Sequence, residues 1–257
     1  MEESKKVWVT GSIILILLVA VFLIYFLVIS PSRKIEEEPL KVEEIKTTAE
    51  TEIGEEKVAR PEALDISLAE SDRRLRELAQ NLSLHPFFAR WIKTDGLIQR
   101  FVAVVNNIAQ GESPRPHLDF LKVNEKFKTT KEDGRCYIDP ASYKRYDVLA
   151  DVFASLDTEG CVRLYWLFQK PIKEAYAELG YPHQEFHPVL LKAIKELLKV
   201  PVVEGKIEVV PRVTTYVYKQ EELEKLSDAQ KHLLRMGPSN VEIIETKLQE
   251  FYEALKK

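Results

Sequence analysis

The sequence predicts a mainly α-helical protein with a single-pass N-terminal transmembrane helix, a flexible acidic tether and a compact helical domain with a small antiparallel β-sheet. An uncharged apolar run lies near the N-terminus, a glutamate-rich stretch follows it, and apolar residues then recur at helical spacing. We therefore expect a short cytoplasmic tail at residues 1–6, the transmembrane helix at 7–29, a disordered acidic linker at 30–67 and the helical domain at 68–257.

The apolar run Val7–Ile29 is long enough to cross a membrane as a helix. A helix rises about 1.5 Å per residue, so roughly 20 apolar residues span a hydrocarbon core about 30 Å thick. A cleaved signal peptide is the alternative, but its apolar region is usually about 7–15 residues long. The best cleavage candidate is also followed at once by Pro31, which we expect to obstruct processing. The run is therefore interpreted as a retained anchor.

The charges beside this run give only a weak orientation signal. Two lysines precede it, and an arginine and a lysine follow it, so the positive-inside tendency is nearly balanced. The tail before the run is too short for a folded domain. We therefore predict a single-pass protein of the bacterial inner membrane with its N-terminus in the cytoplasm and its C-terminal domain in the periplasm.

The net charge of the chain comes mostly from the tether. The whole chain has a formal charge of −4, whereas residues 67–257 contain 29 basic and 28 acidic side chains. A glutamate-rich segment poor in aromatics cannot bury enough apolar area to order itself, although it could also dock a basic partner. The nearly neutral domain lacks the basic surface that nucleic-acid binding needs. No nucleic-acid partner is expected.

The first part of the domain is predicted to be helical. Ser71 is expected to cap a first helix. A turn at His85 leads into a short buried helix that ends near Trp91, and Asp95 is expected to cap the most regular helix of the domain. The apolar face of that helix extends to Ile108.

Two segments have the composition of β-structure. Phe127–Ile138 is predicted to be a hairpin, because Asp133 and Gly134 tolerate the positive φ angles of a tight turn. Ile207–Tyr218 is rich in β-branched residues and is predicted to be a strand. Pro211 within it argues for an edge position or a bulge.

Helices are predicted over the rest of the chain. One helix is expected to begin at Asp139 and Pro140, and another to run from Thr158 to Leu179 with a kink near Pro171. A third is expected from Pro188 to Lys199. Two C-terminal helices are expected to begin with capping boxes, at Ser227 with Gln230 and at Ser239 with Glu242.

Four segments of the domain resemble an uncharacterised bacterial family, a domain of unknown function. They are Asp95–Val102 continuing through Val105, Asn106 and Asn107; Tyr143–Asp147; Tyr176–Pro182; and Leu234–Pro238. The likeness extends over nearly the whole domain. Members of that family typically carry an N-terminal membrane anchor and a tether, so the resemblance implies an envelope location. It implies no activity.

Polar side chains within these segments are candidates for a ligand-binding cleft. They are Asp95, Arg100, Asn106, Asn107, Arg145, Tyr146, Tyr181, Arg235 and Asn240. Convergent arginines and amides suit a carboxylate or a sugar. The alternative is that the acid and amides cap helices while the arginines bind loop carbonyls. Aromatic residues offer a second hypothesis, a shelf for glycans at Trp91, Trp166, Tyr143 and Tyr176, against the alternative of ordinary core packing.

The cysteines and two histidines raise further alternatives. Cys136 and Cys161 are the only cysteines, and in an oxidising compartment they form either a disulfide or two buried thiols. His183 and His187 have the four-residue spacing of helical metal ligands. Prolines bracket them and the metalloprotease order is absent, so they are weak candidates and no metal site is predicted. No cofactor is predicted either.

These observations favour a membrane-tethered module of the cell envelope that binds or scaffolds a protein or a cell-wall component without catalysis. The alternative is an envelope hydrolase or transferase that uses the arginine-, asparagine- and tyrosine-lined cleft. A deep pocket with a buried carboxylate would favour the enzyme, and a broad apolar surface would favour the binding module.

Overall fold

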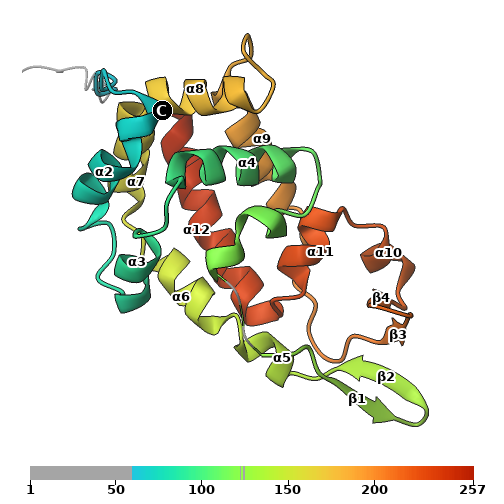
Figure 1. Ribbon diagram of the computed structural model, residues 1–257. Coiled ribbons are helices and arrows are strands. Elements are labelled where there is room, and N and C mark those ends of the chain that lie inside the picture. Colours follow the sequence, from blue (N-terminus) through green and yellow to red (C-terminus); the bar gives the residue numbers. More distant parts are fainter. Residues whose placement is uncertain (1–59, 122, 124) are drawn as a thin grey trace, which may run out of the picture. The chain divides into compact units, whose positions relative to one another are not determined.

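The computed structural model describes residues 60–121, 123 and 125–257 (Figure 1). The expected transmembrane helix and most of the expected linker lie outside these residues. Within the described residues, no helix combines the length and the apolar character that crossing a bilayer requires.

The described chain forms eleven α-helices, two 3-10 helices and four short strands. They are α2 (Leu68–Ala79), α3 (Pro86–Trp91), α4 (Leu97–Ala109), η1 (Arg115–His117), η2 (Asp119–Leu121), β1 (Thr129–Glu132), β2 (Arg135–Ile138), α5 (Ala141–Lys144), α6 (Asp147–Ala154), α7 (Thr158–Leu167), α8 (Gln169–Glu178), α9 (Phe186–Leu197), β3 (Val209–Pro211), β4 (Tyr216–Tyr218), α10 (Glu221–Glu224), α11 (Asp228–Leu234) and α12 (Pro238–Lys256). The prediction of a mainly helical domain is therefore confirmed.

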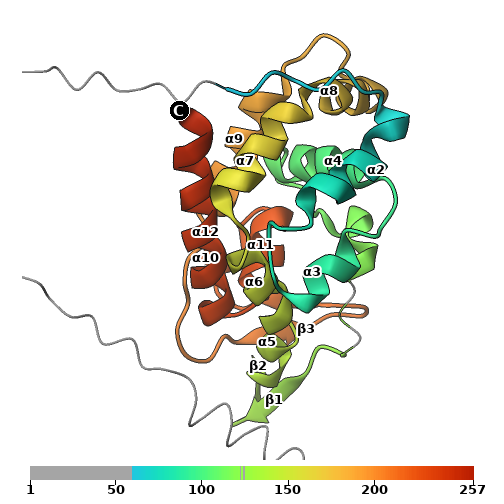
Figure 2. The same ribbon diagram turned by 90° about the vertical axis from the view of Figure 1, so that its left-hand side faces the viewer.

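The centre of the domain is α4, which packs against α8 and α9 and also contacts α2 (Figure 1). Most of its inward positions are apolar and buried, including Val102 at 1% exposure. The longest helix, α12, contacts α6, α7 and α9 and lies on the opposite side of the domain from α2 and α3 (Figure 2). These contacts bury one continuous apolar core.

The first hairpin forms as the sequence predicts. Strands β1 and β2 pair antiparallel from Thr129 with Ile138 to Glu132 with Arg135. Asp133 and Gly134 supply the turn with φ angles of 48° and 74°. Asp and Gly are favoured in such turns because both tolerate the left-handed region.

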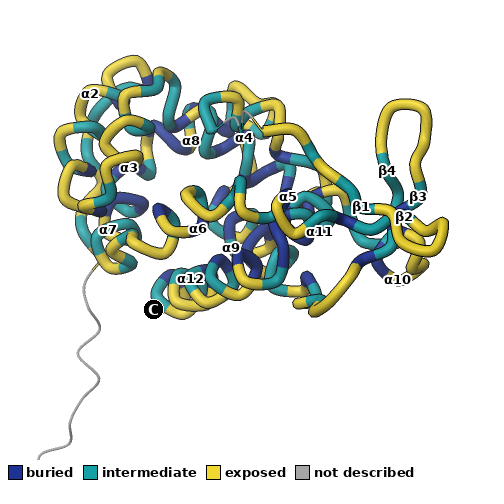
Figure 3. The backbone as a smooth tube through the Cα atoms, turned by 90° about the horizontal axis from the view of Figure 1, so that it is seen from below, coloured by how far each residue is buried: buried dark blue, intermediate teal, exposed yellow. Residues whose placement is uncertain are grey.

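The single strand expected at Ile207–Tyr218 is instead a second hairpin, so the domain has two small sheets rather than one. Val209 pairs with Tyr218, and Pro211 ends β3 opposite Tyr216. Val213 lies in the loop between β3 and β4, which is exposed over its whole length (Figure 3). The β-propensity of the segment predicts its strands but not the exposed turn residues that interrupt them.

Two predicted helix caps are wrong in position. Ser67 rather than Ser71 begins α2, in a capping box with Glu70, and Ser71 is buried one turn later with its hydroxyl donating to the Leu68 carbonyl. At the C-terminus, Gly237 rather than Ser239 precedes α12. The other predicted capping box, Ser227 with Gln230 at the start of α11, is confirmed.

The expected kinked helix at 158–179 is interrupted at Phe168, which has φ −98° and ψ 21° and separates α7 from α8. Pro171 explains the position of the break, because a proline has no N–H and its ring excludes the carbonyl four residues earlier. That carbonyl belongs to Leu167. It accepts instead a 2.8 Å hydrogen bond from the Leu64 N–H.

Residues 60–67 form a strap along α7 and α8. The Arg60 guanidinium lies 4.0 Å from the ring centroid of Trp166, and Asp65 forms an ion pair with Lys170. Glu174 then accepts a 2.7 Å hydrogen bond from the Leu68 N–H, at the first residue of α2. The sequence predicts residues 60–67 to be part of a disordered linker, but these residues lie against the domain.

Candidate functional site

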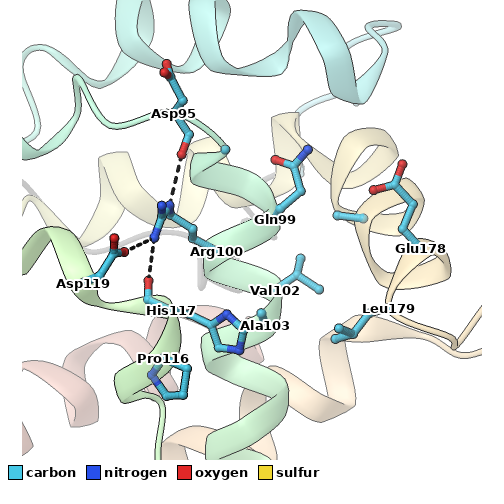
Figure 4. Close-up of a pocket in the computed structure, with 12 residues that line it drawn as sticks. Asp95, Gln99, Arg100, Val102, Ala103, Pro116, His117, Asp119, Glu178 and Leu179 are labelled. Carbon is cyan, nitrogen blue, oxygen red and sulfur yellow. Dashed lines mark hydrogen bonds and ion pairs between the residues drawn. The ribbon is translucent and has the colours of Figure 1, made fainter.

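An open pocket lies over the N-terminal half of α4, between η1 and η2 on one side and the end of α8 on the other (Figure 4). We call it the α4 pocket, and its volume is about 780 Å³. It is lined by Asp95, Gly96, Gln99, Arg100, Val102, Ala103, Pro116, His117, Asp119, Ala175, Glu178 and Leu179. A pocket of this size and openness suits a segment of a larger partner as well as a small molecule.

The start of α4 is organised by a residue from α2. Gly96 precedes the helix in a left-handed conformation with φ 69°, and α4 has no side-chain cap of its own. The Asp72 carboxylate accepts hydrogen bonds from the N–H groups of Gly96, at 2.6 Å, and Leu97, at 2.9 Å. The prediction that Asp95 caps this helix is therefore wrong. The Asp95 side chain is 97% exposed and pairs with Arg76 at 2.7 Å.

Arg100 holds one wall of the α4 pocket in place (Figure 4). Its Nε donates to the Asp95 carbonyl at 3.1 Å, and one Nη donates to the His117 carbonyl at 3.2 Å and to the Asp119 carboxylate. The side chain thus fastens η1 and η2 to α4. Because its charge is already paired, Arg100 is a weaker receptor for an incoming anion than a free arginine would be.

The remaining lining separates into an apolar floor and an acidic rim. Val102, Ala103 and Ala175 form part of the floor, and Leu179 is an apolar residue at the edge with 40% exposure. Glu178 stands at the rim, and no ion-pair partner for it occurs among the described residues. Asp95 and Asp119 are paired with arginines, so Glu178 is the carboxylate above the apolar floor that is left to attract a cationic and partly apolar ligand.

Of the nine residues predicted to line a cleft, Asp95 and Arg100 line the α4 pocket. Asn107 lies near the end of α4 and donates a 3.4 Å hydrogen bond to the Ser113 carbonyl. Asn106 is buried on the same helix, and its Oδ1 has no hydrogen-bond partner among the described residues. Tyr181 follows α8 and stacks on Tyr176 with ring centroids 4.8 Å apart.

The other four predicted residues lie near α5 and the turn between α11 and α12. Arg145 donates to the carbonyls of Ser142, at 2.8 Å, and Glu125, at 3.1 Å, and its guanidinium lies over the Tyr146 ring. Asn240 is buried and donates to three acceptors, the carbonyls of Tyr143 and Met236 and the carboxylate of Asp147. Arg235 lies over the Tyr218 ring.

Both cysteines are free thiols. Cys136 lies on β2 and Cys161 in the first turn of α7. Burial, and to a smaller extent the charge of Asp157, raises the pKa of the Cys161 thiol to about 12. A thiol held protonated in this way is a poor nucleophile at neutral pH.

The two histidines proposed as weak metal ligands differ in setting. His187 lies in the first turn of α9, with Nδ1 3.1 Å from the Tyr165 hydroxyl, and burial and the Arg60 charge lower its pKa. His183 lies in the turn before that helix. Across residues 60–121, 123 and 125–257, no group of three or more His, Cys, Asp or Glu side chains is arranged to hold a metal.

The aromatic residues of the proposed shelf occupy separate places. Trp166 contacts Tyr165 and His187 on the strap side of the domain, and Trp91 pairs with Phe87 on α3. The short helix α3 is not buried as expected, since Phe87 is 40% exposed.

Sequence reasoning missed four polar residues of the α4 pocket: Gln99, His117, Asp119 and Glu178. Gln99 lies on the same predicted helix as Arg100 and could have been included from helical spacing. The others come from the short 3-10 helices η1 and η2 or from the end of α8, where no periodicity indicates which residues face α4. Only tertiary packing brings them together.

The fold and the pocket together describe the class of protein, which is a mainly helical domain with two peripheral hairpins and an open pocket lined by acidic and apolar residues. More particularly, the chain belongs to the family described as protein of unknown function DUF3014, which matches residues 97–252. The resemblance to an uncharacterised family is thereby confirmed. No curated protein and no solved structure matches the chain.

Proposed function

We propose that the chain is a membrane-tethered binding module of the bacterial cell envelope, and that its domain holds a basic segment of a partner protein in the α4 pocket. The observation that carries this proposal is the lining of that pocket. Its floor is apolar, its one arginine is already paired with Asp119, and the carboxylate of Glu178 at its edge has no ion-pair partner among the described residues. Such a surface attracts a cationic chain and buries the apolar side chains between its charges.

The anchor and tether support an envelope location in this proposal. The apolar run Val7–Ile29 has the length and composition of a membrane span, and the domain that follows is nearly neutral. A domain retained near a bilayer meets partners in or beside that bilayer at high effective concentration. A structural role for the anchor helix in assembling a complex is compatible with the same arrangement.

The alternative of an envelope hydrolase or transferase receives less support. That hypothesis calls for several arginines and amides converging with a buried carboxylate, and Arg100 is the one arginine among the residues that line the α4 pocket. Binding therefore accounts better for this surface.

The test measures binding of lysine- and arginine-rich peptides to the full-length chain in lipid nanodiscs. We expect Glu178→Lys, which reverses a rim charge, to weaken the affinity of a selected peptide at least about tenfold, with a loss that shrinks as salt rises. Asp151→Lys makes the same reversal at an exposed site of α6 and serves as the control. Equal affinities for the two variants would contradict the pocket as the binding surface.

A further inference from the structure

Three basic side chains come together beside the turn between α11 and α12. We call Arg115, His232 and Arg235 the basic cluster. His232 and Arg235 are three residues apart at the end of α11 and therefore share a face. Arg115 begins η1, and the chain before it is fastened to α11 by a 3.1 Å hydrogen bond from the Ala229 N–H to the Gly111 carbonyl.

The three groups are close enough to act on one another electrostatically. Burial, and to a smaller extent the charges of Arg235 and Arg115, lower the pKa of His232 to about 4. In the described part of the chain, neither arginine has a carboxylate within ion-pair distance. Like charges without a counter-charge are unfavourable, so the cluster is better suited to an anion than to solvent alone.

A buried hydroxyl faces this positive charge without a partner. Tyr218 is 5% exposed, and its hydroxyl has no hydrogen-bond partner among the described residues. The Arg235 guanidinium carbon lies 6.0 Å from the Tyr218 ring centroid, and its charge and its N–H groups lower the pKa of that hydroxyl. A guanidinium offers donors and no acceptor, so the O–H of Tyr218 still lacks an acceptor. Burial nevertheless dominates and raises this pKa to about 12, so the group remains a hydrogen-bond donor.

One carboxylate acts on the Tyr218 hydroxyl, but it is engaged elsewhere. Glu224 acts on the Tyr218 hydroxyl, but one of its oxygens accepts a 2.8 Å hydrogen bond from the Tyr218 N–H. The other oxygen lies 3.5 Å from the ammonium group of Lys231. Both oxygens of Glu224 thus serve to hold β4 and α11 together.

Ordinary helix electrostatics explains part of this arrangement but not all of it. The carbonyl end of a helix favours cations, which accounts for His232 and Arg235 at the end of α11. It does not account for Arg115, which comes from another segment, or for a buried tyrosine hydroxyl without a partner. Buried polar groups are normally satisfied, so the Tyr218 hydroxyl indicates a missing acceptor.

We propose that the basic cluster and the Tyr218 hydroxyl form a binding site for an oxyanion, the carboxylate or phosphate group of a ligand. The guanidinium groups supply charge and paired donors, and the hydroxyl supplies a further donor from the buried side. This site is separate from the α4 pocket and does not depend on the function proposed for it. The opposite charge preferences of the two surfaces would let one domain hold a basic and an anionic partner group together.

The experiment follows the His232 imidazole by NMR in the full-length, isotope-labelled chain while inorganic phosphate or sodium acetate is added at constant ionic strength. His232→Gln assigns the resonance. We expect a saturable shift at pH 6, and a pKa of His232 that rises by about one unit or more when phosphate is bound, because an adjacent anion favours the protonated form. The anion that binds with the higher affinity, phosphate or acetate, identifies the class of ligand.

Variants decide whether the site causes the shift. Arg235→Gln and Arg115→Gln are each expected to weaken binding at least about tenfold, whereas Arg163→Gln, at an exposed arginine of α7, leaves it unchanged. Tyr218→Phe is expected to keep or increase the stability of the free protein and yet to weaken binding several-fold. A shift that does not saturate, or one that persists in Arg235→Gln, would overturn the proposal.

Discussion

At the scale of single residues, the start of α4 depends on a carboxylate that belongs to another helix. Capping rules apply to neighbours in the sequence, and they selected Asp95, which stands next to the helix. The residue that accepts the first two N–H groups is Asp72, far earlier in the chain. Sequence reasoning thus identified the start of the helix and the chemistry of its cap but not the residue, because tertiary packing of α2 on α4 decides it.

Replacement of Asp72 by alanine tests this cap. Asp72→Ala removes two hydrogen bonds at the start of α4 and is expected to lower the free energy of unfolding by about 2 kcal/mol. Asp95→Ala removes an almost fully exposed carboxylate and is expected to cost less than about 0.5 kcal/mol. Urea unfolding followed by tryptophan fluorescence measures both, and equal losses would show that Asp72 is not the cap that matters.

His232 gives the domain a pH-dependent stability. The folded pKa is about 4 and the usual value is 6.5, so between these values the unfolded chain binds a proton that the folded chain does not. Stability therefore falls as the pH drops from about 6.5 toward 4, and no further loss arises from this group below that range. At neutral pH the penalty is absent.

The expected loss from this histidine is about 2 kcal/mol between pH 7 and pH 5, from the proton-linkage relation. His232→Gln removes the titration, so its unfolding free energy is expected to fall less over the same interval. The difference between the wild-type and variant pH profiles isolates the contribution of His232 from that of the carboxylates. Parallel profiles would mean that the imidazole is solvated in the folded protein.

At the scale of elements, the sequence predicted most helices but fewer turns. The capping box at Ser227 and the Asp133–Gly134 hairpin were found because each is a local signal with one structural solution. The second hairpin was missed since its turn lacks such a signal. The α4 pocket was found in part, through Asp95 and Arg100, because residues from η1, η2 and α8 meet there only after packing.

The turn between α11 and α12 requires a glycine for two reasons. Gly237 has φ 88°, and a Cβ atom at this position would lie 2.4 Å from Cγ of Tyr143. Gly237→Ala is therefore expected to cost about 3 kcal/mol or more, since both the backbone and the tyrosine must shift.

Gly180→Ala is the matched control for this substitution. Gly180 also has a positive φ, 106°, but no heavy atom lies within 4 Å of its added Cβ. Its replacement is expected to cost about 1 kcal/mol, the strain of the left-handed region alone. Thermal or urea unfolding of the two variants separates steric from conformational cost. A larger loss at Gly180 than at Gly237 would contradict this account.

At the scale of the whole molecule, the membrane anchor that we propose would determine where the domain acts. We expect the full chain to remain in the membrane fraction after alkaline extraction, and deletion of residues 7–29 to release a folded domain. In spheroplasts, added protease is expected to reach the domain and not the N-terminal tail. A mature protein recovered in solution without its first thirty residues would contradict both expectations.

The strap determines how mechanical load enters the domain. Tension that arrives from the N-terminal side acts first on the Arg60–Trp166 contact and then on the hydrogen bond between the Leu64 N–H and the Leu167 carbonyl. Both contacts lie at the junction of α7 and α8, where the Leu167 carbonyl has no helical partner because Pro171 lacks an N–H. A pull on residue 60 would therefore load these peripheral contacts of the strap before it reaches the start of α2.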